Sequence, residues 1–297
     1  MPVFPNLVSG VCLLLLSAAA LAEAQLRVRV EPANSALKSN IEGYIGSLGD
    51  RDAEAVQRYR RVAENQAEKA AQALGYYQAQ ITTEVSEGAT PRLTLRIQPG
   101  EPVRLRDVVV RIEGPATELR AFRTPNDPQL RSGAPLNHGH YDAAKREIQN
   151  QASRYGFFAG RFSRQRLTID PDAGVADIEL IYNSGPRYRL GAVQFVGDAP
   201  FDEQLLQRMV PFPADTPYDS TLIAELYQAL RSSGYFESVQ VDANPSSAAS
   251  EQIPVQVQLQ ARKPRSMGLG LGFSTDVGPR GRANWTRHWA NPQGHSY

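Results

Sequence analysis

A glycine followed by two aromatic residues occurs three times in this chain, at a spacing of about 80 residues. The motifs are Gly75-Tyr76-Tyr77, Gly156-Phe157-Phe158 and Gly234-Tyr235-Phe236. A motif that recurs at a fixed spacing of this size indicates one supersecondary unit repeated along the chain. The chain is therefore expected to fold as a series of three similar units.

Each motif follows a run of residues with the apolar spacing of an amphipathic helix. The apolar positions are Val56, Tyr59, Ala63, Ala67, Ala70 and Leu74 before the first motif, Tyr141, Ala144, Ile148, Ala152 and Tyr155 before the second, and Leu222, Ile223, Leu226, Tyr227 and Leu230 before the third. Asp219 or Ser220 is suited to cap the third helix. Glycine directly after the last apolar position predicts a helix stop, because it adopts the left-handed conformation without strain. The aromatic pair is expected to begin a strand and to fold back over the helix.

Strand patterns complete each unit. Apolar and polar residues alternate in 92–98, 175–183 and 253–261, and extended segments after turn residues begin the later units at 99–112 and 184–197. Short first helices are expected in 34–48, 117–123 and 202–210. The repeated order is strand, helix, helix, strand, strand, in which a parallel pair and an antiparallel hairpin make a three-stranded mixed sheet with helices on one face. The sequence predicts an α+β fold.

Each such sheet would have an open edge. Polar residues occur on the strands that follow the motifs, at Gln78, Gln80, Arg164, Arg166, Glu237 and Gln240. Two interpretations remain open at this point. The polar side chains protect the edge from unwanted pairing, or the edge captures an extended client as an additional strand.

The N-terminus predicts export. Residues 8–20 are an apolar run with the length of a signal-peptide core, and small residues at Ala20 and Ala22, or at Ala22 and Ala24, form a cleavage site. An uncleaved anchor helix is the alternative, because no Lys or Arg precedes the apolar run. The single cysteine, Cys12, lies in this segment, so the mature chain is expected to have neither a disulfide nor thiol chemistry.

Charge and motifs argue against a nucleic-acid binder and against an enzyme. The chain has 32 Lys and Arg residues against 31 Asp and Glu residues, far from the basic balance of a dedicated nucleic-acid protein. His138, His140 and Asp142 suggest a metal cluster, but they lie at the approach to a helix with no further cluster to support them, which favours a solvated turn. No Gly-x-Ser-x-Gly nucleophile motif occurs. We expect no catalytic activity and no cofactor.

From Lys263 onward the pattern changes. Met267, Leu269, Leu271 and Phe273 alternate with Ser266, Gly268, Gly270, Gly272 and Ser274. This period of two extends over about nine residues, the length of a tilted membrane strand. After a turn, a second run has Ala283, Trp285, Arg287 and Trp289 on one face. The two tryptophans are suited to the aromatic belt of a bilayer, with Arg287 near the headgroups.

The alternating glycines have two other interpretations. A dinucleotide-binding loop requires Gly-x-Gly-x-x-Gly at the start of a helix, whereas here the third glycine comes two residues after the second and polar turn residues follow. A strand of a soluble sandwich would show the same alternation. The phosphate loop is the weaker of the two alternatives, because its spacing rule is not met.

Together these motifs resemble the TamA family, the outer-membrane subunits of the translocation and assembly module. The resemblance rests on the three glycine–aromatic motifs, on "GLGLGFSTDVGPRG" at 268–281 and on "HWANPQGHSY" at 288–297. It implies three tandem POTRA (polypeptide-transport-associated) domains followed by an outer-membrane β-barrel. The expected organisation is a signal peptide at 1–24, POTRA domains at 25–98, 99–183 and 184–262, and the first one to two barrel strands at 263–297.

The resemblance also implies a function. Members of the family work with an inner-membrane-anchored TamB-like partner, act on unfolded outer-membrane protein clients, and help to assemble outer-membrane β-barrel and autotransporter proteins without ATP or metal. The barrel lies among outer-membrane lipid and the POTRA domains lie in the periplasm. The first barrel strand closes weakly against the last and forms a gate where a client strand pairs. By position this gate strand is Ser266, Met267, Gly268, Leu269, Gly270, Leu271, Gly272, Phe273, Ser274 and Thr275.

The chain departs from the family pattern because it ends about two strands into the barrel, and a lone hairpin leaves unpaired backbone groups in lipid. We therefore expect either a fragment or truncated product, or strands that are not membrane strands. Two other functions remain open. A two-partner secretion transporter usually carries two repeats rather than three, and a soluble periplasmic peptide-binding scaffold would use the tail as a linker hairpin.

Overall fold

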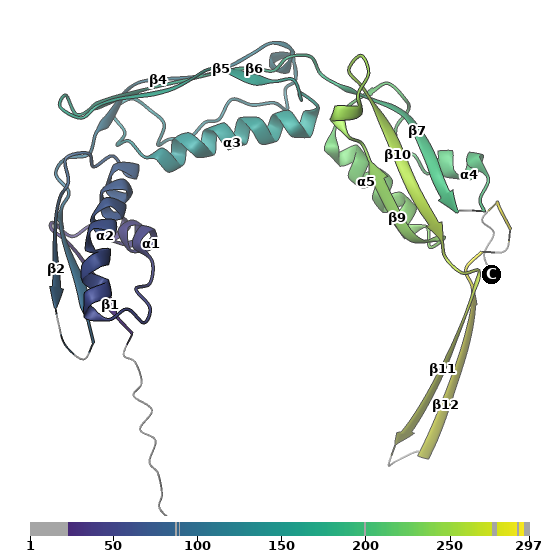
Figure 1. The fold of residues 1–297 in the computed structure, drawn as a ribbon. Coiled ribbons are helices and arrows are strands. Elements are labelled where there is room, and N and C mark those ends of the chain that lie inside the picture. Colours follow the sequence, from purple (N-terminus) through teal and green to yellow (C-terminus); the bar gives the residue numbers. More distant parts are fainter. Residues whose placement is uncertain are drawn as a thin grey trace, which may run out of the picture. The chain divides into compact units, whose positions relative to one another are not determined.

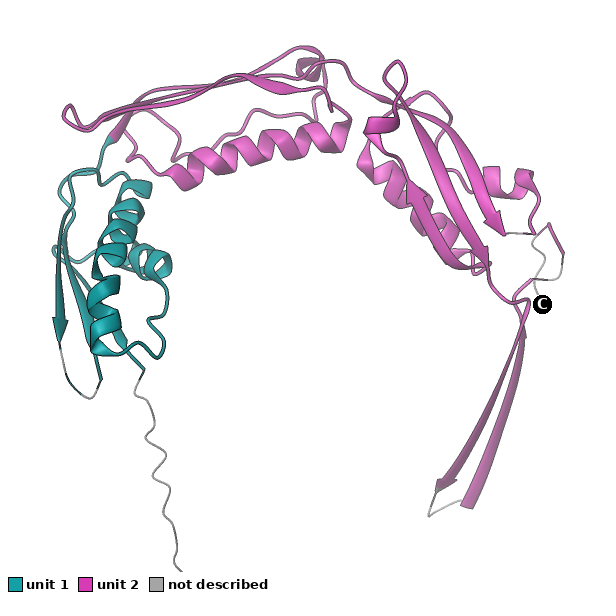
Figure 2. Cartoon of the chain, in the orientation of Figure 1, with its two compact units in different colours: residues 1–103 teal, residues 104–297 magenta. Residues whose placement is uncertain are grey.

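The computed structural model describes residues 23–86, 88, 90–198, 200–274, 278–289 and 291–293 (Figure 1). The chain divides into two compact units, Met1–Val103 and Arg104–Tyr297 (Figure 2). Residues 1–22 of the expected signal peptide lie outside the described residues. Among the helices in the described ranges, none is both long enough and apolar enough to cross a membrane.

The first unit is a three-stranded sheet with two helices packed on it (Figure 1). Its elements are β1 (Gln25–Val30), α1 (Ser35–Ile45), α2 (Ala53–Ala73), β2 (Gln80–Ser86) and β3 (Arg92–Gln98). The strand order is β1-β3-β2, with β1 parallel and β2 antiparallel to β3. The predicted order of strands and helices, and the mixed sheet, are confirmed in this unit.

Small residues allow α2 to lie close to the sheet. Its fully or nearly fully buried residues are Val56, Ala63, Ala67, Ala70 and Ala71. They share a core with Leu93, Leu95 and Ile97 of β3. Alanine is the strongest helix former and adds little volume, so an alanine-rich face favours both the helix and its close approach. The predicted apolar face of this helix is confirmed.

The second unit begins with a sheet of the same kind. Its elements are β4 (Arg104–Glu113), the 3-10 turn η1 (Pro115–Glu118), α3 (His138–Tyr155), β5 (Arg161–Asp170) and β6 (Val175–Asn183). The strand order is β4-β6-β5, with β4 parallel and β5 antiparallel to β6. All five predicted apolar positions of α3 are buried.

The short helix expected at 117–123 is wrong. Only the 3-10 turn η1 forms, and residues 119–137 run as a long loop that contains three prolines and a glycine, residues that interrupt a helix. Gln151 of α3 holds this loop, because its Oε1 accepts from the Arg123 amide at 2.6 Å and its Nε2 donates to the Arg123 carbonyl at 2.8 Å. Phe122 beside it is buried against Tyr155 and Phe157. The loop thus supplies an apolar side chain to the core without a helix.

The second sheet of this unit has four strands rather than the expected three. Its elements are β7 (Arg189–Asp198), α4 (Glu203–Arg208), β8 (Thr216–Pro217), α5 (Ser220–Ser232), β9 (Phe236–Asp242), the 3-10 turn η2 (Pro245–Ser247) and β10 (Gln252–Ala261). The order is β8-β7-β10-β9. The additional strand, β8, pairs with only Arg189 and Leu190 of β7, so no alternating pattern marks it in the sequence. Asp219 caps α5, as one of the two predicted choices.

The motif glycines end their helices as predicted. Gly75, Gly156 and Gly234 have φ angles of 88°, 84° and 77°, in the region that favours glycine. The expectation that the aromatic pairs begin strands is wrong for the first two motifs, where β2 starts at Gln80 and β5 at Arg161. There the two aromatic residues lie in a turn, and the amide of the first one donates a hydrogen bond to a carbonyl of the preceding helix.

The turn after α3 packs against the second sheet of the same unit. The Phe158 ring meets the ring of Tyr188 edge-on, with centroids 5.5 Å apart, and the ring of Tyr218 at 4.9 Å. The amide of Tyr188 donates to the Gly156 carbonyl at 2.8 Å. We call Gly156, Phe158, Arg187, Tyr188 and Tyr218 the Phe158 junction. It joins the two sheets of this unit by side-chain packing as well as by the chain itself.

Arg187 adds hydrogen bonds to the Phe158 junction. Its Nε donates to the Tyr155 carbonyl at 2.9 Å and its Nη2 donates to the Tyr218 carbonyl at 3.0 Å. Partial burial lowers the pKa of Arg187, and the nearby carboxylate of Asp219 opposes that effect. The guanidinium remains charged at any physiological pH. It therefore bridges the end of α3 and the segment before α5 with charge-assisted hydrogen bonds.

Candidate functional site

Within the described residues, each of the three helix-covered sheets ends on one side in a strand that has no outer partner strand. These strands are β2, β5 and β9, and each follows one of the three motifs. The polar residues noted in the sequence, Gln78, Gln80, Arg164, Arg166, Glu237 and Gln240, are all exposed. These edge strands therefore carry polar side chains and have one row of backbone groups available for pairing. Both interpretations of the sequence, protection of the edge and capture of an extended client, are compatible with this.

A groove runs beside β5, the longest of these edges. It has a volume of about 540 Å³ and lies between α3 and β5. Its lining includes Phe157, Phe162 and Tyr182, with Arg161 and Gln165 from the edge strand. The rings of Phe162 and Tyr182 meet edge-on at 5.1 Å, and burial raises the pKa of Tyr182. An extended segment paired with β5 would lie along this aromatic floor.

The opposite edge of that sheet is closed at its start. The amide of Leu105 donates to the Ala134 carbonyl at 2.8 Å, and the Gly133 amide donates to the Leu105 carbonyl at 2.7 Å. The end of the long loop thus pairs with the first residues of β4. Between the two edges of this sheet, β5 is the one that the described residues leave open along its whole length.

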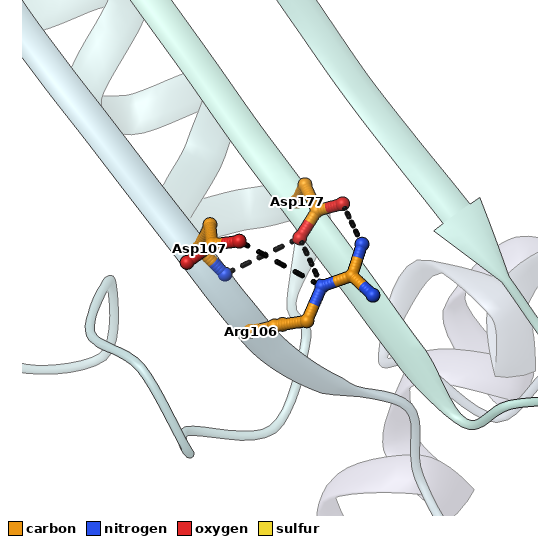
Figure 3. Close-up of polar contacts among 3 residues, drawn as sticks. All are labelled: Arg106, Asp107 and Asp177. Carbon is orange, nitrogen blue, oxygen red and sulfur yellow. Dashed lines mark hydrogen bonds and ion pairs between the residues drawn. The ribbon is translucent and has the colours of Figure 1, made fainter.

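A charged cluster on β4 and β6 has a structural explanation. Arg106 Nε donates to Asp177 Oδ1 at 3.0 Å, and its Nη2 donates to Oδ2 at 2.5 Å (Figure 3). The Asp107 amide donates to Asp177 Oδ1 at 3.3 Å. The pairing register of β4 with β6 shifts at this point, between Leu105 and Asp107. The hydrogen bond from Arg106 lowers the pKa of Asp177. The pair holds an exposed β-bulge and needs no ligand to explain it.

The expected gate strand is a strand in the structure. β11 (Arg265–Ser274) pairs with β12 (Gly278–Arg287) as an antiparallel hairpin in continuous register. Nine of the ten proposed gate residues, from Ser266 to Ser274, lie in β11, and Thr275 lies outside the described residues. Met267 and Leu269 of β11 stand opposite Trp285 and Ala283 of β12.

The register separates the hairpin into two unlike faces. One face carries Met267, Leu269, Leu271, Phe273 and Trp285, which are 76%, 81%, 94%, 78% and 60% exposed. A soluble domain rarely leaves so many adjacent large apolar side chains in water. On the other face, Gly268, Gly270 and Gly272 stand opposite Asn284, Arg282 and Arg280. We call these the apolar face and the glycine face.

The glycines differ in how much room they have. A Cβ atom at Gly270 would lie 3.8 Å from the Arg282 Cβ, an ordinary contact, and one at Gly272 would meet nothing within 4 Å. At Gly268 the amide of Asn284 would have to move. The hairpin itself therefore does not require glycine at positions 270 and 272.

The segment after β12 packs back onto the sheet that contains β7 and β10. The Trp289 ring meets the Phe201 ring at 5.3 Å, its Nε1 donates to the Arg262 carbonyl at 3.0 Å, and the Asp202 amide donates to the Pro292 carbonyl at 3.1 Å. The Trp289 ring, which the sequence suggested for a membrane belt, is used in this packing. Trp285 remains on the apolar face.

The histidine motif is not brought together as a site. His140 Nδ1 lies 2.6 Å from Asp127 Oδ2, which ties the long loop to the first turn of α3. Burial lowers the pKa of His138. Among the residues that the structure describes, no group of three His, Cys, Asp or Glu side chains is arranged to hold a metal ion.

Sequence reasoning missed the groove beside β5 and the Trp289 packing. The groove combines α3, β5 and β6, which are separated in sequence, and no local pattern predicts it. A signal for Trp289 exists in retrospect, because it falls beyond the alternating run and is followed by Asn291 and Pro292, which favour a turn.

Two segments of the chain match protein-family models. Residues 27–99 match the model described as POTRA domain TamA domain 1, and residues 188–261 match the POTRA model described as surface antigen variable number repeat. The chain contains POTRA domains. The first match covers the sheet of the first unit, and the second covers the sheet of β7, β8, β9 and β10.

Known relatives agree with this assignment. The outer membrane protein assembly factor BamA of Neisseria meningitidis serogroup B is 23% identical over 185 residues, which are 62% of this chain and 23% of that protein. This chain thus spans about a quarter of the length of the curated relative. With the POTRA matches, this relative supports a place in the Omp85 superfamily, whose members in the outer membrane carry POTRA domains in the periplasm.

Two BamA fragments are among the solved structures that this chain matches. POTRA3-5 of BamA from Haemophilus influenzae is 17% identical, covers 80% of this chain and 96% of its own, and has a TM-score of 0.43. BamA from Haemophilus ducreyi lacking POTRA domains 1-3 is 13% identical, covers 65% of this chain and 36% of its own, and has a TM-score of 0.47.

Proposed function

We propose that this chain is the POTRA region and the first barrel strands of a TamA-like outer-membrane assembly factor. In this role it assists the insertion, assembly and translocation of outer-membrane β-barrel and autotransporter proteins. The proposal rests above all on the β11–β12 hairpin, whose apolar face is exposed and which directly follows a POTRA domain. The match of residues 27–99 to the model of the first TamA POTRA domain supports this branch of the superfamily.

The middle sheet is proposed as a third POTRA domain. Its strand order, β4-β6-β5, repeats the order of β1-β3-β2 in the first unit, and its motif glycine has the same left-handed conformation. It differs by the loop that replaces the first helix. In this proposal the domains occupy 25–98, 99–183 and 184–262, and the barrel begins at 263.

Clients would be recognised by strand addition. The main-chain groups of β5 give affinity with little sequence specificity, and the aromatic groove beside it accepts alternate side chains. In the membrane, β11 would serve as the gate strand. Binding and release of strands need neither ATP nor metal, so the proposed activity is not enzymatic. A TamB-like inner-membrane-anchored protein is the proposed partner, and outer-membrane lipid surrounds the hairpin.

Fractionation and depletion test the proposal. The full-length gene product should partition with the outer membrane, and the segment 25–262, which lacks the exposed apolar hairpin, should remain in the aqueous fraction. Depletion should reduce the amount of folded autotransporter in the outer membrane. Loss of one secreted exoprotein alone would indicate a two-partner secretion transporter instead. A full-length product found entirely in the aqueous periplasm would favour the peptide-binding scaffold.

The structure also bears on the cleavage site of the expected signal peptide. Ala24 is 5% exposed in the core of the first unit, its amide donates to the Gly49 carbonyl at 2.9 Å, and Ser47 Oγ donates to Glu23 Oε1 at 3.1 Å. Cleavage after Ala24 would remove these contacts, whereas cleavage after Ala22 keeps them. N-terminal sequencing of the exported protein should find Glu23 first. A mature chain that starts at Gln25 would contradict this prediction.

A further inference from the structure

A second groove lies along α3, on another flank of the helix than the groove beside β5. It has a volume of about 520 Å³. Its lining includes Ala121 of the long loop and Arg146, Glu147, Asn150, Gln151 and Arg154 of α3. The two grooves share no lining residue. We call this second groove the arginine groove.

The arginine groove lies where the first unit has its first helix. In that unit α1 packs against α2, and Asn40 Nδ2 of α1 donates to the Ala70 carbonyl at 2.7 Å. Gln151 is the equivalent of Ala70, since each lies five residues before its motif glycine. Gln151 instead holds the long loop through its two hydrogen bonds to Arg123, and Ala121 forms part of the rim. This flank of α3 is thus bordered by a loop with a small side chain.

Two arginines make the arginine groove positively charged. Arg146 and Arg154 are exposed, and within the described residues neither forms an ion pair. The Arg154 Cζ atom lies 5.2 Å from the centre of the Tyr155 ring, a cation–π contact that orients the guanidinium. Glu147 is the acidic residue of the lining. The lining therefore has an excess of positive charge, which favours an anionic ligand.

The spacing of the polar side chains along α3 matches an extended polypeptide. Arg146, Asn150 and Arg154 follow one another at four-residue intervals, which places them in one row with steps of about 6 Å. Alternate residues of an extended chain are about 6.6 Å apart. Two carboxylates four residues apart on such a chain would therefore reach both arginines, with Asn150 beside the main chain between them. A single phosphate is too small to span the roughly 12 Å between the two arginines.

We propose that the arginine groove binds an extended acidic segment of an unfolded polypeptide. Carboxylates four residues apart accept charge-assisted hydrogen bonds from Arg146 and Arg154. The amide of Asn150 can both donate to and accept from the main chain between them. This site goes beyond the proposed function, because strand addition to β5 reads no charge and because the groove does not require the hairpin to lie in a membrane. It gives the second unit a preference for acidic sequences.

The test measures the binding of two labelled, end-blocked peptides to the full-length gene product by fluorescence anisotropy. Both peptides consist of serine, threonine and two glutamates. In the first peptide the glutamates are four residues apart, and in the second they are three residues apart, which places them on opposite faces of an extended chain. Wild type should bind the first peptide about tenfold more tightly, because the second can reach only one of the two arginines.

Variants of the protein test the residues. Arg146→Gln/Arg154→Gln should bind the first peptide about tenfold or more weakly, whereas Glu147→Gln should bind it more tightly because a like charge is removed. Arg61→Gln/Arg111→Gln is the matched control, since these arginines of α2 and β4 are exposed and form no ion pair within the described residues. It changes the net charge equally and should stay within about twofold of wild type.

Four results would overturn the site. They are wild type that does not bind the first peptide, equal affinities of wild type for the two peptides, equal losses in the two arginine double variants, and displacement of the first peptide by inorganic phosphate but not by chloride at the same ionic strength. The last result would indicate a site for a compact anion. The single variant Arg146→Gln gives the same comparison in case the double variant does not fold. Failure of the proposed function would leave these binding results unchanged, because the hairpin takes no part in them.

Discussion

Replacing Gly156 with alanine should lower the free energy of unfolding of the segment 25–262 by about 3 kcal/mol, the sum of left-handed strain and overpacking. Gly156 has a φ angle of 84°, and a Cβ atom there would lie 2.6 Å from the Cβ of Tyr218 and 3.3 Å from the Tyr188 carbonyl. Neither atom is the mobile end of a side chain, so the Phe158 junction itself must shift. Urea unfolding followed by circular dichroism measures the change.

Gly234→Ala is the control for this effect. Gly234 ends α5 with a φ angle of 77°, and a Cβ atom there would meet nothing within 4 Å. Its substitution should lower stability only by the backbone strain, about 1–2 kcal/mol. Equal losses for the two variants would contradict a steric cost of the added Cβ at the Phe158 junction.

Replacing Gly270 with leucine in the full-length protein should reduce client assembly by about tenfold or more. A leucine side chain on the glycine face would pack against the last barrel strand, where β11 closes the proposed gate. Burying this side chain stabilises the closed gate by about 1.5–3 kcal/mol. The hairpin accepts a Cβ at this position, so the loss should not arise from a misfolded β11–β12 pair. Assembly of an autotransporter into outer-membrane vesicles by the purified protein provides the readout.

Leu271→Phe is the control that tests whether any larger side chain in β11, rather than one on the glycine face, reduces client assembly. Leu271 is the next residue of β11, on the apolar face, where a larger ring would contact lipid. We expect this variant to assemble clients at the rate of wild type. The gate function of β11 would be refuted by a Gly270→Leu protein that folds as a barrel and assembles clients normally.

Much of the fold could be predicted because its signals are local. Gly75 and Gly156 each follow an amphipathic helix, and the left-handed conformation that ends the helix depends on this single residue. The alternating segments 92–98 and 175–183 coincide with β3 and β6 at both ends. The same is true of β11, whose period of two needs no partner to be recognised. These features depend on residues within one turn or one strand.

What could not be predicted depends on contacts between distant residues. The loop at 119–137 supplies Phe122 to the core around Phe157 without a helix, and the side chain that holds it, Gln151, comes from α3. The opposition of Arg265 and Arg287 depends on the pairing register of β11 with β12, which no pattern within one strand predicts. Trp289 has the same parity as Trp285 in the sequence, yet Phe201 and the Arg262 carbonyl take it out of the hairpin.

The Phe158 junction has a consequence for how a long client would bind. It links the end of α3, beside the sheet of β5, to the segments before β7 and α5, beside the sheet of β9, within one unit. A client segment paired with β5 would then meet β9 as an intramolecular event, at an effective concentration set by the chain between its two strands. Two edges that each bind weakly could in this way retain an unfolded chain with high avidity and release it one strand at a time.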